Sequence, residues 1–164
     1  MDVTKGDLYK FKYHQEEFGD VCTLINVINI LDYMNQSTTV ATLVPYMNQD
    51  YWHEYQNKHA PTKIHGYEIS QVMQLLRRQC RYSHQKVKTD NLMTMNKKFP
   101  FIFLTSPTHA IGVFDHLIFD ANHSTVKKLT LKNLKTYNLE QVNTVFGTNG
   151  KITCWVFYRG NMLK

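Results

Sequence analysis

Residues 18–31 read Phe-Gly-Asp-Val-Cys-Thr-Leu-Ile-Asn-Val-Ile-Asn-Ile-Leu, and this stretch decides the fold. A polar lead-in ends at Gly19-Asp20, and apolar residues at helical spacing follow directly: Val21, Leu24, Ile25, Ile28 and Leu31. The spacing predicts a buried helix that runs to about Met34 and has Cys22 in its first turn. A thiol there feels the positive end of the helix dipole, which lowers its pKa and favours the thiolate. Cys22 is therefore a candidate nucleophile, the alternative being a small buried hydrophobic side chain.

The composition is that of a folded domain. The chain has 164 residues, of which 43% are hydrophobic and 13% aromatic, enough for one core and too apolar for disorder. We therefore expect a single domain over residues 1–164. No run approaches the roughly 18 to 20 apolar residues of a membrane span, and the first residues lack a signal-peptide pattern. These features predict a cytoplasmic or host-cell intracellular protein with no membrane partner.

The cysteines and the net charge limit further the classes of protein to which the chain can belong. Cys22, Cys80 and Cys154 are odd in number and far apart, which argues against a disulfide framework, and no His/Cys pair has zinc-finger spacing. Cys80 and Cys154 fall in apolar patterns and are predicted to pack in the core. A formal net charge of +6 is compatible with a nucleic-acid partner, but the basic residues are scattered, which favours a solvated surface.

The rest of the first half is predicted to be helix and loop. Polar residues 35–38 end the first helix and begin a short second one, which Pro45 ends or kinks. Residues 46–65 are polar and irregular in period, so we predict a surface loop with room for one helical turn, of the kind that serves as a lid or binding loop. A helix opened by Gly66-Tyr67 follows, with one apolar stripe that includes Cys80.

The second half is predicted to be strands. The apolar run 101–104 indicates a buried strand, and the Asn149-Gly150 turn is typical of a hairpin between 142–146 and 152–158. Helices first and strands second are the segregated pattern of an α+β domain.

A hairpin at residues 109–122 supplies the partners that a nucleophilic cysteine needs. With the turn at Asp115-His116, residue 114 faces 117, and His109 faces Asn122, with Asp120 one diagonal step away. His109 is thus the candidate base and either Asp120 or Asn122 its orienting group, although a one-residue bulge would change which is nearer. Each residue taken alone also fits an ordinary strand or turn. The positions predicted to share one face of the hairpin are 109, 111, 113, 118, 120 and 122.

Two stretches resemble the papain-like cysteine peptidase superfamily. They are Gly-Asp-Val-Cys-Thr-Leu-Ile-Asn at 19–26, and His-Ala-Ile-Gly-Val at 109–113 with Asp-Ala-Asn at 120–122. The chain looks most similar to compact members such as Josephin-type deubiquitinases, bacteriocin-processing peptidases and small viral or mobile-element peptidases. The resemblance implies a papain-like α+β fold, in which N-terminal helices pack against a C-terminal antiparallel sheet. The central helix would carry the nucleophile. It also implies Cys22 as nucleophile, His109 as base, and Asp120 or Asn122 as orienting residue.

The same resemblance implies a glutamine upstream of the nucleophile whose amide helps to bind the oxyanion. Gln15 is the candidate in the lead-in, but Glu16 and Glu17 occupy the more usual spacing. With Asp20, these carboxylates oppose thiolate formation unless His109 is an imidazolium. The backbone N–H of Cys22 would be the second donor.

Cysteine peptidase chemistry is the leading hypothesis. The Cys22–His109 ion pair would attack a peptide or isopeptide carbonyl, and water would release the acyl-enzyme. No metal or organic cofactor is implied, and the partner is a polypeptide substrate, such as a polyprotein or a ubiquitin-like conjugate. The same triad would serve an acyltransferase that uses an amine. The alternative from another class is a papain-like binding module with weak or lost activity, which the acidic lead-in and the displaced Gln15 favour.

Overall fold

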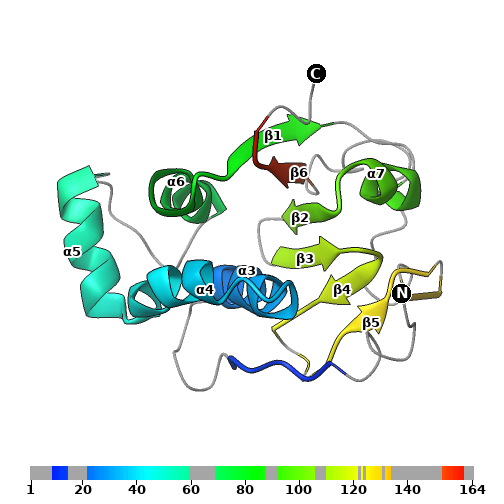
Figure 1. Ribbon diagram of the computed structural model, residues 1–164, viewed down its shortest axis with the longest axis horizontal. Coiled ribbons are helices and arrows are strands. Elements are labelled where there is room, and N and C mark those ends of the chain that lie inside the picture. Colours follow the sequence, from blue (N-terminus) through cyan, green and yellow to red (C-terminus); the bar gives the residue numbers. More distant parts are fainter. Residues whose placement is uncertain are drawn as a thin grey trace.

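The structure is a computed structural model that describes residues 9–14, 22–59, 69–87, 92–105, 110–121, 123, 125–130, 132–133 and 153–160. These residues form an α+β arrangement of helices and one antiparallel sheet (Figure 1). The helices are α3 (Cys22–Tyr33), α4 (Ser37–Leu43), the 3₁₀ helix η1 (Val44–Met47), α5 (Gln49–His59), α6 (Ile69–Cys80) and α7 (Leu92–Lys98). The strands are β1 (Ser83–Val87), β2 (Phe101–Thr105), β3 (Ala110–Phe114), β4 (Leu117–Phe119), β5 (Lys127–Lys128) and β6 (Thr153–Tyr158). Within the described ranges, no helix has the length and apolar character that crossing a membrane requires.

The sheet has the strand order β1-β6-β2-β3-β4-β5, and each neighbouring pair is antiparallel. β6 comes last in the chain but lies between β1 and β2, so it joins the two parts of the sheet. The predicted buried strand at 101–104 is confirmed as β2, which lies near the middle of the sheet.

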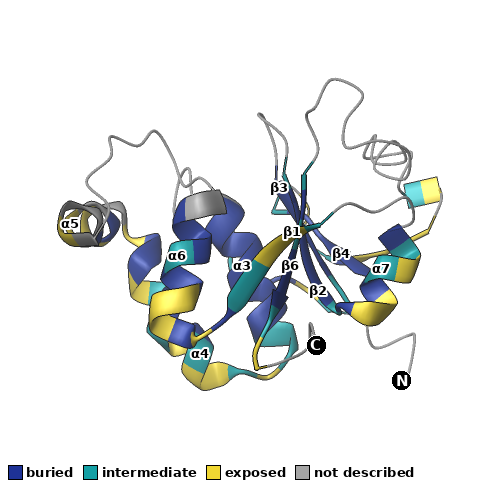
Figure 2. Cartoon of the chain, turned by 90° about the horizontal axis from the view of Figure 1, so that it is seen from above, coloured by how far each residue is buried: buried dark blue, intermediate teal, exposed yellow. Residues whose placement is uncertain are grey.

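Helices cover both faces of the sheet. Figure 2 shows the sheet nearly edge-on, with α3, α4 and α6 on one side and α7 on the other. Side chains of β2 alternate between the two cores: Phe101 and Phe103 pack on the α3 side, and Ile102 and Leu104 pack on the α7 side. A strand buried on both faces reads as a continuous apolar run, which explains the Phe-Ile-Phe-Leu sequence.

Helix α3 is buried over most of its length. Every residue from Thr23 to Leu31 is buried, and α3 ends at Tyr33, so the predicted helix from Cys22 to about Met34 is confirmed. Burial extends beyond the predicted apolar stripe, because Val27 and Ile30 are fully buried as well. A helix that is apolar all round is a core helix, and α3 fills that role here.

The loop predicted at residues 46–65 is wrong over the part that the structure describes. Residues up to 59 form η1 and the 11-residue helix α5, whereas 60–65 lie outside the described residues. Trp52 and Tyr55 are one helical turn apart, are buried, and stack with ring centroids 5.2 Å apart. Tyr46 meets the Tyr55 ring edge-on at 5.1 Å. The helix was missed because two aromatic residues, Trp52 and Tyr55, rather than aliphatic residues form its buried stripe.

The hairpin turn at Asp115-His116 is confirmed. Residues 114 and 117 are paired, as predicted, and the register continues through Val113 with Ile118. Asp115 and His116 have φ values of 49° and 64°, the left-handed conformation that a tight two-residue hairpin needs at both central positions. The side-chain oxygen Oδ1 of Asn96 accepts a hydrogen bond from the His116 N–H at 2.6 Å, so the unpredicted helix α7 fixes this turn.

At Gly112, β3 approaches α3 too closely to leave room for a side chain. A Cβ at this position would collide with the Cδ1 atom of Ile30, which is fully buried. We expect Gly112→Ala to lower the free energy of unfolding by about 1–3 kcal/mol through overpacking. Ile30→Val removes Cδ1 and alone should cost about 0.5–1.5 kcal/mol.

Chemical denaturation of both single variants and the double variant tests this contact. The double variant should be more stable than the sum of the two losses predicts, because the colliding atom is gone. Strictly additive losses would contradict the packing of α3 on β3 at Gly112.

Candidate functional site

Helix α3 and strand β3 run side by side in the same direction. The side-chain amide Nδ2 of Asn26 donates a hydrogen bond to the carbonyl of Ala110 at 3.0 Å. One helical turn later, Ile30 packs against Gly112, and the ring centroids of Tyr33 and Phe114 lie 6.1 Å apart. Four helical residues rise about 6 Å and two strand residues about 6.7 Å, so the two elements stay in step.

Cys22 is the first residue of α3, which confirms its predicted place in the first helical turn. Its thiol lies outside the part of the chain that the structure describes, as do Gln15, His109 and Asn122. Of the predicted site residues, Asp120 alone has a described side chain. The structure does describe the immediate neighbours of these positions: Ala110 directly follows His109 in the chain.

The face shared by the hairpin residues is partly confirmed. Ile111, Val113 and Ile118 belong to one apolar cluster, as the predicted alternation requires. This cluster lies on the α7 side of the sheet, whereas Ala110 and Phe119 pack on the α3 side. Strict alternation would therefore direct residues 109 and 120 away from α3. β3 begins at Ala110 and β4 ends at Phe119, so both candidates flank the strands rather than belong to them.

Asp120 is a buried carboxylate at the end of β4, with 4% of its surface exposed. The chain turns here, because the Asp120 carbonyl accepts a hydrogen bond from the His123 N–H at 2.9 Å. Its carboxylate oxygen Oδ2 lies 3.7 Å from Nε2 of His123, an imidazole whose side chain is 46% exposed. Burying a carboxylate is costly unless it is paired, so a histidine beside Asp120 is physically expected. His123 was not among the predicted site residues.

Two further polar residues of this region were missed in the sequence. Asn26 and Asn29 are fully buried in α3, four and seven residues after Cys22. At these spacings they lie on the same side of the helix as Cys22. Amides inside an otherwise apolar helix were the available signal, because a buried amide requires hydrogen-bond partners.

Within the described residues, the Asn26 side chain is hydrogen-bonded through its nitrogen, but not through its oxygen. Nδ2 bonds the Ala110 carbonyl, but the buried oxygen Oδ1 has no hydrogen-bond partner within the described ranges. An unpaired buried acceptor costs about 1–3 kcal/mol, so it needs an explanation other than stability. The unpaired oxygen lies one helical turn from the Cys22 backbone.

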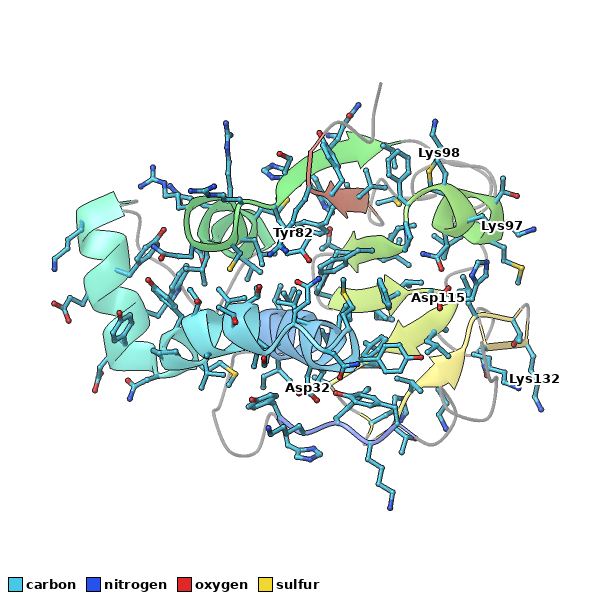
Figure 3. The ribbon with its side chains drawn as sticks, in the orientation of Figure 1. Asp32, Tyr82, Lys97, Lys98, Asp115 and Lys132 are labelled. Atoms are coloured by element: carbon cyan, nitrogen blue, oxygen red, sulfur yellow. The ribbon has the colours of Figure 1, made fainter. Side chains whose placement is uncertain are left out.

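Asn29 holds the lead-in segment against α3. Its oxygen Oδ1 accepts hydrogen bonds from the N–H groups of Lys12 and Tyr13 at 3.2 and 3.1 Å, and its Nδ2 donates to the Tyr13 carbonyl at 3.0 Å. The hydroxyl of Tyr9 donates to Asp32 at 2.9 Å, close to the C-terminal end of the helix. Figure 3 shows Asp32 between α3 and the segment 9–14. Burial, together with the Asp32 bond, raises the pKa of Tyr9, so this hydroxyl remains a donor.

Cys80 and Cys154 are free thiols and are both buried, as predicted. Burial raises the pKa of Cys80 to about 11, although Arg159 acts in the opposite direction. Burial raises the pKa of Cys154 to about 12. Neither environment favours a thiolate, so neither residue has the properties of a nucleophile.

The described residues contain no group of three or more His, Cys, Asp and Glu side chains that could hold a metal ion. The chemistry that this part of the chain offers is that of a buried carboxylate directly after β4 and of two buried amides on α3, four and seven residues after Cys22.

Comparisons with protein-family models, curated proteins and solved structures found no match for this chain.

The two buried thiols give a direct test of the core. At pH 8, roughly one in a thousand Cys80 side chains would be ionised, and fewer of Cys154, because of the raised pKa values. We expect iodoacetamide to label neither residue appreciably in the folded protein and both rapidly in denaturant, as measured by peptide mapping. Labelling of the folded protein at the rate of a free thiol would contradict their burial.

Proposed function

We propose that the chain is a cysteine peptidase with a papain-like fold, in which Cys22 is the nucleophile and His109 the base. The proposal rests on one observation above others, the ladder of contacts between α3 and β3. The contacts Asn26–Ala110 and Ile30–Gly112 advance by four residues on the helix and two on the strand. Four residues before Asn26 on the helix is Cys22, and two residues before Ala110 on the chain that enters the strand is residue 108.

Chain continuity supports the same pairing. Consecutive Cα atoms are about 3.8 Å apart, so the Cα of His109 must lie at about this distance from the Cα of Ala110. The carbonyl of Ala110 accepts the hydrogen bond from Asn26. Asn26 in turn is one helical turn from Cys22, about 6 Å along the axis. A triad in this place requires the alternation of β3 to end at Ala110, with the His109 side chain directed to the α3 side. The free oxygen of Asn26 would be an acceptor on that side.

Asp120 is the favoured orienting residue in this proposal, and Asn122 the alternative. Asp120 is a buried carboxylate placed where β4 ends, and the turn after it removes the constraint of strand alternation. A buried carboxylate beside an imidazole holds the ring and stabilises its protonated form. His123 already lies near Asp120, so the proposal requires Asp120 to serve His109 with its remaining hydrogen-bonding capacity.

The reaction follows from these roles. The Cys22 thiolate attacks the carbonyl carbon of a peptide or isopeptide bond, and the oxyanion forms near the free N–H groups of the first helical turn. Imidazolium donates its proton to the leaving amine, the C–N bond breaks, and a thioester remains. Water, deprotonated by the imidazole, then hydrolyses the thioester and regenerates the thiol.

A peptide vinyl sulfone and a ubiquitin vinyl sulfone test the assignment. Labelling, followed by intact mass, should be lost in Cys22→Ala and fall by about 10²–10⁴ in His109→Ala. Cys80→Ala is the matched control, since it removes a buried thiol, and should label as the wild type does. Undiminished labelling of Cys22→Ala would refute the proposal, and the preferred probe would indicate the substrate class.

The orienting residue can be assigned in the same assay. If Asp120 orients His109, Asp120→Ala should slow labelling more than Asn122→Ala and move the pH profile of the reaction, because the imidazolium loses its stabilising charge. The reverse order would assign the role to Asn122. Incorporation of an added amine instead of hydrolysis would identify an acyltransferase, and an ordinary thiol pKa at Cys22 would indicate a binding module.

A further inference from the structure

We infer that the part of the surface formed by α6, β1 and β6 binds the phosphate backbone of a nucleic acid. The basic residues are scattered along the sequence, but the fold gathers all four arginines of the chain here. Two are in the last turn of α6, one directly follows this helix, one directly follows β6, and a lysine on β1 adds a fifth positive charge. All five residues are exposed. We call them the basic edge: Arg77, Arg78, Arg81, Lys86 and Arg159.

The pairing of β6 with β1 brings Arg159 to the end of α6. Tyr158 lies opposite Ser83, so the next residue, Arg159, comes beside Tyr82. The guanidinium carbon Cζ of Arg159 lies 4.1 Å from the centroid of the Tyr82 ring. The Tyr82 N–H in turn donates a hydrogen bond to the carbonyl of Leu76 in α6, at 3.1 Å. Figure 1 shows α6 leading into β1, with β6 next to β1.

Arg77 and Lys86 extend the basic edge along β1. Burial and the nearby positive charge of Arg77 lower the pKa of His84, which places this arginine beside the strand. Residues 84 and 86 lie on the same face of β1, because side chains of a strand alternate. From Ser83 to Lys86 the strand advances about 10 Å, which is the length of about three phosphates along one strand of a duplex.

No acidic residue neutralises this surface within the described ranges. Residues 69–87 and 153–160 contain no Asp or Glu, and no described carboxylate forms an ion pair with Arg77, Arg81 or Lys86. The segment from α3 to α5, by contrast, contains three acidic residues and one basic residue. The net charge of +6 is therefore distributed unevenly over the molecule. Such a concentration of one sign of charge attracts a polyanion.

Stabilisation of the helix end explains only part of the basic edge. Cations in the last turn of a helix offset the negative end of its dipole, which accounts for Arg77 and Arg78. The charge of Arg78 also acts on Tyr55 of α5, where it opposes the rise in pKa that burial causes. The three other members of the basic edge lie outside α6, so the helix dipole does not account for them.

Arg159 is held in place while it remains exposed. Its guanidinium lies over the Tyr82 ring, and Nη2 donates a hydrogen bond to Oγ1 of Thr39 at 3.2 Å. A guanidinium has five N–H donors in a fixed fork, so most of them stay available to an anion. Because the side chain is already ordered, binding a phosphate costs little further conformational entropy.

The basic edge offers charge without an apolar anchor, which favours a nucleic acid over other anionic partners. Among the described residues, the exposed large hydrophobic side chain is Tyr51, on α5. Protein partners bind chiefly through buried aromatic and aliphatic anchors, and membrane-surface binding needs an inserted apolar face. A phosphate backbone requires neither, because its affinity comes from neutralised charge and released counterions. Contacts of this kind carry no base preference.

The salt dependence of binding tests the inference. Fluorescence anisotropy of a labelled single strand and a labelled duplex of about 20 nucleotides should show binding by at least one of them. The slope of log K against log salt changes by about 0.7 for each phosphate contact on a single strand and by about 0.9 on a duplex. Arg77→Gln, Arg81→Gln and Lys86→Gln should each reduce the slope by about this amount and weaken binding about five- to eightfold at about 0.1 M salt. Absence of binding by both oligonucleotides, or unchanged slopes in all three variants, would overturn the inference.

Two control variants separate position from net charge. Lys127 is exposed on β5, at the opposite end of the strand order, and Lys127→Gln should bind within about twofold of the wild type. Arg81→Lys keeps the charge and should retain the wild-type slope. A loss in Lys127→Gln equal to that in Arg81→Gln would mean that net charge alone drives binding, which contradicts a site at the basic edge.

Competition identifies the class of partner. Polyglutamate and phosphatidylserine vesicles should displace the oligonucleotide less well than an unlabelled oligonucleotide at the same concentration of negative charge. Stronger displacement by either would assign the surface to an acidic polypeptide or to a membrane, and the inference would be wrong. Cys22→Ala should bind as the wild type does, because the basic edge is independent of the proposed peptidase chemistry.

Discussion

The burial of α3 against the sheet is the constraint on which the other features depend. A helix buried over nine consecutive residues, from Thr23 to Leu31, can carry amides only where other segments supply hydrogen-bond partners. Asn26 finds its partner at the start of β3 and Asn29 finds its partners in the lead-in. Polar groups that would destabilise an isolated apolar helix thereby attach two distant parts of the chain to α3.

Much of the fold was predictable because its elements have strong local patterns. The α3 helix, the strand β2 and the turn at Asp115-His116 were all read from periodicity and turn position, and all are confirmed. Helix α5 was not, because its buried stripe is made of Trp52 and Tyr55 among polar residues. Sheet order was also beyond sequence reasoning, since nothing local indicates that β6 pairs with both β1 and β2.

The predictions about the candidate site also depended on whether a property is local or tertiary. The position of Cys22 at a helix start is a local property, and it was predicted correctly. The faces of the hairpin were predicted correctly as a set for Ile111, Val113 and Ile118, but which face meets α3 is a tertiary property that alternation alone cannot give. Asn26 and Asn29 were overlooked because their partners, the backbones of Ala110 and Tyr13, carry no side-chain signature in the sequence.

The central place of β6 has a consequence for the order of events during synthesis. Strands β2, β3 and β4 are consecutive among the described strands and can pair as they emerge, whereas β1 pairs, within the described part of the chain, with β6 alone and so only after residues 153–158 have been made. Until then β1 and β2 each present an unpaired edge, the form of a sheet that invites association with other chains. Arrival of β6 closes both edges at once and joins β1 to the rest of the sheet. A nascent chain of this protein therefore completes its sheet only after residues 153–158 have been made.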